Sequence, residues 1–171
     1  MTPLWPHIAI LGFVTLQRLT ELPVARANTK RLLAAGGHEV APGHYPLVVA
    51  LHASWLITLW LLALGRPINL AMLGLFALLQ VLRGWTLRTL GSRWTTRIIV
   101  VPGEQLVARG PYKFVDHPNY VVVVGEIAVL PLVFGLVWVA VVFTILNAAI
   151  LWVRIRAENN ALGRAEENRS S

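Results

Sequence analysis

The chain has 171 residues, of which 56% are apolar and 13% are charged. In a typical soluble domain about a quarter of the residues are charged. The composition therefore excludes a disordered chain and predicts an integral membrane protein. The formal net charge is +7, but the basic residues form no dense run of the kind that binds nucleic acid, and no nucleic-acid partner is expected. The chain has no cysteine, which excludes disulfides, thiolate metal ligands and a cysteine nucleophile.

Charge-free stretches predict five membrane helices, because about 20 apolar helical residues cross a bilayer core. The first is expected to continue past Arg18 and Glu21 as a retained span. The last apolar stretch is too long for one crossing, and Pro131 and Gly135 predict a break that makes it a tight helical hairpin. In chain order, the expected spans are residues 1–17 with their continuation, 45–65, 67–90, 120–134 and 136–156.

These spans are expected to form one all-α, polytopic membrane domain. It comprises three N-terminal helices (residues 1–90), a cap segment (91–118), the hairpin (119–156) and a tail (157–171). The cap, the tail and the loop after the first span are rich in lysine and arginine, so we expect them in the cytoplasm and the N-terminus outside. Arg83, in the third span, is expected near the membrane surface.

The cap is the longest polar segment between two predicted spans. Its residues 97–107 predict two short extended runs around a turn at Pro102 and Gly103. At its end, Pro118 suits the first turn of the fourth span, with His117 at the start of the helix. The free backbone amides of that first turn suit an anionic group.

Ionisable side chains at membrane depth cost free energy and are functional candidates by default. Asn119 and Glu126 are seven residues apart, which places them on one face of the fourth span. Asn147, Arg154 and Glu158 lie at offsets of seven and eleven on the fifth, and Arg154 and Glu158 also form an i,i+4 pair. A third, weaker cluster lies on the first helix and around the start of the second, at Arg18, Glu21, Arg26, Asn28, His44 and His52.

Each of these clusters also has an ordinary structural interpretation. A histidine before a proline is often a helix cap, and an arginine–glutamate pair at the end of a span is often an interfacial anchor. A histidine within an apolar helix, such as His52, is more often an interior residue with its hydrogen bonds satisfied than a ligand-binding residue. The histidines have no metal-ligand spacing, and no metal site is expected.

The segment from Gly91 to Leu162 resembles the isoprenylcysteine carboxyl methyltransferase family of integral membrane enzymes. The motifs that carry this resemblance are Gly110-Pro111-Tyr112, His117-Pro118-Asn119-Tyr120 and residues 154–162, and residues 18–22 and 43–46 look like the bacterial branch of the family. Two positions depart from the pattern. Asp116 stands where the family usually has arginine, and Asn159 stands where a second glutamate is usual.

The resemblance implies S-adenosylmethionine as the cofactor and assigns roles to individual residues. Arg154 is expected beside the reacting oxygen, and Glu126 or His117 is expected to take a proton if the acceptor is a hydroxyl group; Arg154 and Glu126 are thus the predicted catalytic residues. The cofactor-binding residues are expected to be Gly110, Tyr112, His117, Pro118, Tyr120, Glu158, Asn159 and Leu162. The substrate-binding candidates are Arg18, Glu21, Asn28, His52 and Asn147.

The expected reaction is O-methylation of a carboxyl or hydroxyl group on a lipophilic acceptor, with an active site that faces the cytoplasm from a bacterial inner membrane. The acceptor is expected to be isoprenylcysteine-like or, preferably, a small long-chain polyketide lipid such as an alkylpyrone or alkylresorcinol. An NADPH-dependent membrane lipid or sterol reductase is the first alternative, although the chain has no glycine-rich dinucleotide fingerprint. A non-enzymatic membrane scaffold or small transporter is the second.

Overall fold

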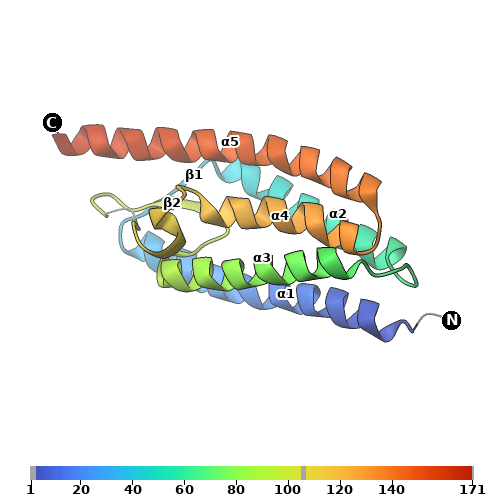
Figure 1. Ribbon diagram of the computed structural model, residues 1–171. Coiled ribbons are helices and arrows are strands. Elements are labelled where there is room, and N and C mark those ends of the chain that lie inside the picture. The colour runs from blue at the N-terminus through green and yellow to red at the C-terminus, as the bar shows by residue number, and fades with distance from the viewer. Residues whose placement is uncertain (1–2, 105–106, 171) are drawn as a thin grey trace.

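The computed structural model of the protein describes residues 3–104 and 107–170, but not the side chains of residue 159 or of residues 161–170. Five long helices lie alongside one another (Figure 1). They are α1 (Trp5–Ala34), α2 (Tyr45–Leu62), α3 (Leu70–Leu90), α4 (Pro118–Val133) and α5 (Val137–Ser170).

The helices confirm an all-α, polytopic membrane protein. In the described part of the chain, four helical segments are long and apolar enough to cross a membrane: Trp5–Ala34, Pro42–Leu62, Leu70–Arg93 and Val137–Glu158. The fourth of the five predicted spans, α4, is apolar but has only 16 residues. Exposed apolar side chains such as Leu61, Leu70 and Trp138 cover the outside of the bundle, as expected for helices that face lipid.

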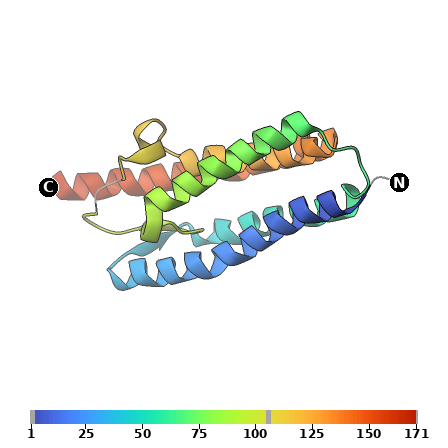
Figure 2. The ribbon, with the colours of Figure 1, turned by 60° about the horizontal axis from the view of Figure 1, so that its bottom comes forward.

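The helices pack in two layers, as Figure 2 shows, with α1 and α2 in one and α3, α4 and α5 in the other. Within the second layer α3 packs on α4 and α4 packs on α5, while α2 contacts α5 across the layers. The apolar core contains Leu11 of α1, Trp55 and Leu59 of α2, Phe76 of α3 and Leu130 of α4, all at most 4% exposed.

The predicted hairpin of the last two helices is confirmed. Pro131 lies in the last turn of α4, and Gly135 between the helices has a positive φ of 67°, a conformation that favours glycine. The backbone N–H of Leu136 donates to the carbonyl of Pro131 at 2.9 Å, which closes the turn. The helix α5 then continues through the predicted tail to Ser170, and its C-terminal end projects beyond the rest of the bundle (Figure 1).

The cap differs from the sequence prediction. Of the two expected runs, the first contains a strand, β2 (Ile98–Val100), which pairs antiparallel with β1 (His38–Val40) in the α1–α2 connection. Val107 of the second run lies outside any strand, and residues 105 and 106 lie outside the described residues. The turn at Gly103 is confirmed by a positive φ of 78°.

Candidate active site

The first candidate site lies where α4 begins and α5 leaves the bundle, and it centres on the carboxylate of Glu158. The hydroxyl of Tyr120 donates to Oε2 of Glu158 at 2.8 Å. Nδ1 of His117 lies 3.9 Å from the same oxygen, and the His117 and Tyr120 rings stack with their centroids 5.2 Å apart. The site therefore presents one carboxylate, one phenol and one imidazole within a single contact network.

The local sequence explains how α4 contributes two of these groups. His117 is the N-cap residue, and Pro118 occupies the first turn of α4, where its missing N–H and fixed φ are tolerated. The backbone N–H of Tyr120 donates to the carbonyl of His117 at 3.0 Å. This first turn holds the two rings in their stack, on the side of α4 that meets α5.

Tyr112 approaches the same carboxylate from a short 3-10 helix, η3 (Gly110–Lys113). Burial raises the pKa of the Tyr112 phenol above its usual range, and the negative charge of Glu158 raises it further. The phenol is therefore a hydrogen-bond donor throughout the physiological pH range.

Gly110 holds η3 against α3. Its φ is 59°, and a Cβ atom at this position would lie 2.6 Å from Oγ1 of Thr89 and 3.3 Å from Nε1 of Trp85. Both the backbone conformation and the close approach therefore require glycine. The predicted role of Gly110 in the cofactor pocket is thus accompanied by a packing role that the sequence alone does not show.

Arg154 lies one helical turn before Glu158 on α5 and is 7% exposed. Its Nη2 donates to the backbone carbonyl of Thr96 in the cap at 3.1 Å, and its charge also acts on the Tyr120 phenol. Among the described residues, Arg154 and Glu158 do not form the i,i+4 ion pair that their spacing suggested. The guanidinium is instead fixed between α5 and the cap, beside the residues around Glu158.

A second group of polar residues, here called the charge cluster, joins α1, α3 and α4. Its members are Arg18, Glu21, Gln80, Arg83 and Glu126. Arg83 pairs with Glu21 at 2.5 Å, and Glu126 accepts from Arg18 at 2.6 Å and from Arg83 at 3.0 Å through the same oxygen. Gln80 donates to the other oxygen of Glu126 at 2.8 Å. The two positive and two negative charges balance, which a buried ionic group requires.

The charge cluster corrects one prediction from the sequence. Arg83 was expected to reach the membrane surface, but its side chain is 4% exposed and points inward to two carboxylates. Gln80 was missed altogether. The signal for both was their spacing, because Phe76, Gln80 and Arg83 lie at offsets of four and seven and share the inward face of α3.

The predicted substrate-binding residues do not form a single cluster. Arg18 and Glu21 belong to the charge cluster, and His52 is close enough to interact electrostatically with Arg18 and Glu126. His52 also contacts the carbonyl of Val48 through Nδ1 at 2.8 Å. These residues lie together at the centre of the bundle.

The other two substrate-binding candidates lie elsewhere. The amide of Asn28 donates to the carbonyls of Trp94, at 2.8 Å, and Gly91, at 3.3 Å, so it ties α1 to the end of α3. Asn147 is 1% exposed, and its amide nitrogen has no hydrogen-bond partner among the described residues. The side chains of Asn159 and Leu162, predicted to bind the cofactor, lie outside the described residues. In the described part of the chain, no three histidine, aspartate or glutamate side chains converge as metal ligands.

Comparison with known proteins identifies one matching family and one similar bacterial protein. Residues 72–164, which contain the cap, α4 and the described site on α5, match the model of the isoprenylcysteine carboxyl methyltransferase family. The chain is also 40% identical over 163 residues to the uncharacterized protein YpbQ of Bacillus subtilis (strain 168), and this alignment covers 92% of the chain and 95% of that protein. No solved structure matches the chain.

Proposed function

Because the chain belongs to the isoprenylcysteine carboxyl methyltransferase family, and is therefore a membrane methyltransferase, we propose that it transfers a methyl group from S-adenosylmethionine to an oxygen atom of a lipophilic acceptor. The observation that carries this proposal is the convergence of Tyr120, His117 and Tyr112 on the carboxylate of Glu158. These residues come from the family motifs and meet at one end of the bundle.

The donor and acceptor groups of this site fit the proposed cofactor. S-adenosylmethionine carries an ammonium group and ribose hydroxyls, which are donors that a carboxylate accepts. Glu158 is 28% exposed on its side chain, so it is reachable while already held by Tyr120. When bound, the cofactor supplies a sulfonium methyl group that is already activated, and the protein's task is mainly to position the acceptor.

We assign the cofactor to Glu158, Tyr120 and His117, with Gly110, Tyr112 and Pro118 shaping the pocket around it. The family pattern adds Asn159 and Leu162 to this set. Asn159 retains a hydrogen-bond acceptor in place of the usual second glutamate but lacks its charge.

Arg154 is the proposed contact for the reacting oxygen. It is buried, fixed by the Thr96 carbonyl and adjacent to the cofactor residues. A carboxylate acceptor is already a nucleophile, and Arg154 would orient it. For a phenol or enol, the cation lowers the pKa of the acceptor hydroxyl. We propose that His117, rather than Glu126, takes the proton of such a hydroxyl group, because both oxygens of Glu126 already accept hydrogen bonds from Arg18, Gln80 and Arg83.

The proposed acceptor is a lipid that enters from the side of the bundle. An apolar groove of about 380 Å³ runs between α1 and α3 and reaches Gln80, which donates to Glu126. This groove suits a long alkyl or prenyl tail. We propose that the polar part of the acceptor then extends past Arg18, His52 and Asn147 toward Arg154, with Glu21 and Glu126 balancing the charge of the arginines along this path.

The cap and the active site are proposed to face the cytoplasm of a bacterial cell, where S-adenosylmethionine is made. The basic cap and tail favour this orientation, and the relative from Bacillus subtilis makes a bacterial membrane the natural setting.

Calorimetric titration of the detergent-purified protein with S-adenosylhomocysteine, with NADPH as the paired control, tests the proposal. Micromolar binding of S-adenosylhomocysteine alone is expected. Binding of NADPH alone would reverse the assignment in favour of a reductase. With the cofactor established, transfer of a labelled methyl group to alkylpyrone, alkylresorcinol or prenylcysteine acceptors identifies the substrate class.

A further inference from the structure

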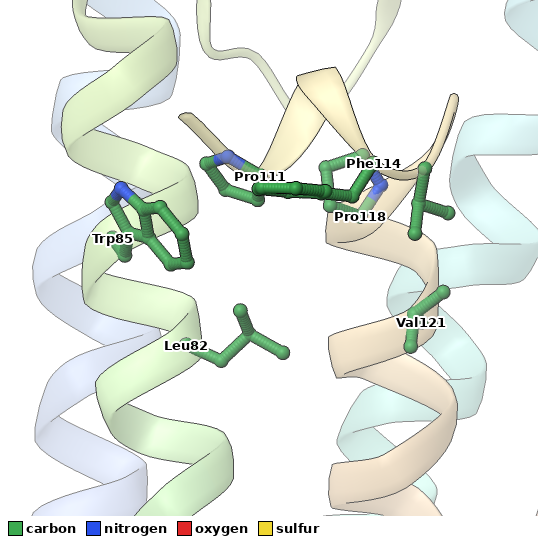
Figure 3. A pocket seen from close by; sticks show the side chains of 7 residues that line it. Leu82, Trp85, Pro111, Phe114, Pro118 and Val121 are labelled. Atoms are coloured by element: carbon green, nitrogen blue, oxygen red, sulfur yellow. The ribbon is translucent and has the colours of Figure 1, made fainter. Parts of the chain in front are cut away.

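An apolar pocket lies on the side of α4 that faces α3 (Figure 3). It has a volume of about 140 Å³ and lies between α3 and α4, under η3. Its lining consists of Leu82, Trp85, Pro111, Phe114, Val115, Pro118 and Val121. No polar side chain other than the indole of Trp85 contributes to this lining, so the pocket suits a hydrocarbon chain rather than the cofactor.

The pocket faces outward, toward the lipid side of the bundle. Phe114 is 76% exposed, Val121 is 50% exposed and Trp85 is 49% exposed, although all three side chains are predominantly apolar. Both helices that form its walls belong to the apolar part of the bundle. Aromatic side chains at such a position are typical of the membrane–water interface.

Three cations lie in the segments that contribute the pocket lining: Arg88 on α3, Arg109 before η3 and Lys113 at its end. All three are exposed, and none has an ion-pair or hydrogen-bond partner among the described residues. Asp116 is the single acidic residue between positions 105 and 125. Gly110 packs against Trp85 and Thr89, which brings Arg109 to the same corner as Arg88. The corner therefore carries a net positive charge beside an apolar pocket.

We propose that this pocket and the three cations beside it bind an anionic membrane phospholipid, with part of one acyl chain in the pocket and the phosphate among Arg88, Arg109 and Lys113. The indole N–H of Trp85 has no acceptor among the described residues and is available to the phosphate or an ester oxygen. Such a lipid would support η3 from the bilayer side. Because Tyr120 contacts Glu158 of α5 and does not line the pocket, the lipid would not occupy the proposed methyl-transfer site.

Charge complementarity decides between this occupant and a neutral lipid. Each lysine or arginine near an anionic membrane surface contributes roughly 1 kcal/mol, which corresponds to about a five-fold change in affinity. A neutral phospholipid would gain the apolar contacts but little from the three cations. The pocket is therefore expected to select for phosphatidylglycerol over phosphatidylcholine.

The test is native mass spectrometry of the full chain after exchange into mixed micelles that contain equal amounts of phosphatidylglycerol and phosphatidylcholine. The parent is expected to retain one phosphatidylglycerol in clear excess over phosphatidylcholine. The variant Arg88→Gln/Arg109→Gln/Lys113→Gln is expected to lose this preference. The charge-matched control Arg26→Gln/Lys30→Gln/Arg31→Gln, at the exposed end of α1, is expected to keep it.

A second variant tests the pocket separately from its charges. Val121→Trp fills the apolar space from an exposed position and is expected to abolish retention of the lipid while all three cations remain. Parent-like cooperative unfolding of each variant shows that it is folded. Equal retention of the two lipids by the parent, or unchanged retention in either pocket variant, would overturn the proposal. None of these readouts depends on cofactor binding, so their outcome does not decide whether the proposed methyl transfer is correct.

Discussion

The hydroxyl of Tyr120 and the carboxylate of Glu158 meet at 2.8 Å although they lie 38 residues apart in the chain. This hydrogen bond joins the first turn of α4 to the part of α5 that leaves the bundle. The α4–α5 hairpin makes the contact possible, because the two helices run antiparallel from the turn at Gly135. The hairpin thus brings two separate family motifs together into one site.

Replacing Glu158 by Gln is expected to weaken S-adenosylhomocysteine binding by about 10-fold to 100-fold, because a hydrogen bond to a charged group contributes about 1.5–3 kcal/mol. Because glutamine has nearly the same size as glutamate, the loss of affinity measures the contribution of the negative charge. Calorimetric titration measures the change. Glu104→Gln, in the cap and paired with Arg93 instead, is the control and should bind as the parent does. Parent-like affinity in Glu158→Gln would remove this residue from the cofactor site.

Arg154→Ala is expected to lower the turnover number by at least about 100-fold while changing the affinity for S-adenosylhomocysteine only a few-fold. The reason is that a group that acts mainly in the transition state affects turnover more than binding. Transfer of a labelled methyl group to the identified acceptor measures turnover, and calorimetry measures affinity. The matched control is Arg156→Ala, since Arg156 stacks on Trp152 at 3.7 Å and is exposed. Parallel losses of affinity and turnover in Arg154→Ala would place the residue at the cofactor instead.

The proximity of His117, Tyr120 and Glu158 was expected from the sequence because these residues lie in short motifs that resemble those of the methyltransferase family. His117 and Pro118 are adjacent, Tyr120 follows within one turn, and Arg154 and Glu158 share one face of a helix. The apolar run interrupted at Pro131 and Gly135 was enough to predict the hairpin that joins them. The resemblance to the family motifs therefore implied this grouping, while spacing and the helical break predicted only the shared helix face and the hairpin.

The charge cluster was only half predictable, because its ion pairs join helices that are distant in sequence. Arg18 and Glu21 were recognised as polar residues within a span, but their partners Arg83 and Glu126 come from α3 and α4. A long arginine side chain near the end of a span can reach the surface or turn inward. The face that Arg83 shares with Phe76 and Gln80 favours the inward position, but it does not identify Glu21 and Glu126 as the partners.

The strand pairing in the cap could not be predicted from the sequence, for a different reason. β1 and β2 have three residues each, which is too short for a reliable alternation of apolar and polar residues. Their pairing also depends on where α1 and α3 end. The Asn28 contact with Trp94 holds these ends together, and it is visible only once both helices are in place.

Gly110→Ala is expected to destabilise the cap and weaken cofactor binding. A Cβ atom would meet Thr89 at 2.6 Å, and Thr89 is a short side chain on a helix that cannot move away easily. Gly103→Ala is the matched control, since Gly103 also has a positive φ but no atom of the described residues within 4 Å of the added Cβ. Thermal unfolding and S-adenosylhomocysteine titration should show a larger loss for Gly110→Ala. Thr89→Ala removes both of the closest atoms and should partly restore the Gly110→Ala variant; no restoration would contradict the proposed clash.

Glu126→Gln and Arg83→Gln are each expected to destabilise the protein strongly, because each leaves an uncompensated charge in the charge cluster. Removing one partner of a buried ion pair typically costs about 3–5 kcal/mol, and the side chains of Glu126 and Arg83 are 0% and 4% exposed. Combining the two substitutions leaves one positive charge on Arg18 and one negative charge on Glu21, so the charge cluster is again neutral. The double variant should therefore lose much less stability than the sum of the single variants.

Equilibrium unfolding in mixed micelles measures the four free energies of this double-mutant cycle. A coupling energy of at least about 1 kcal/mol is expected, whereas additive losses would mean that lipid or water compensates each charge separately. The same four proteins also test the catalytic assignment, since Glu126 is proposed to balance charge rather than to take a proton. If the double variant recovers methyl transfer together with stability, Glu126 acts by holding α4 against α1 and α3. If stability returns without activity, a chemical role for Glu126 must be restored to the mechanism.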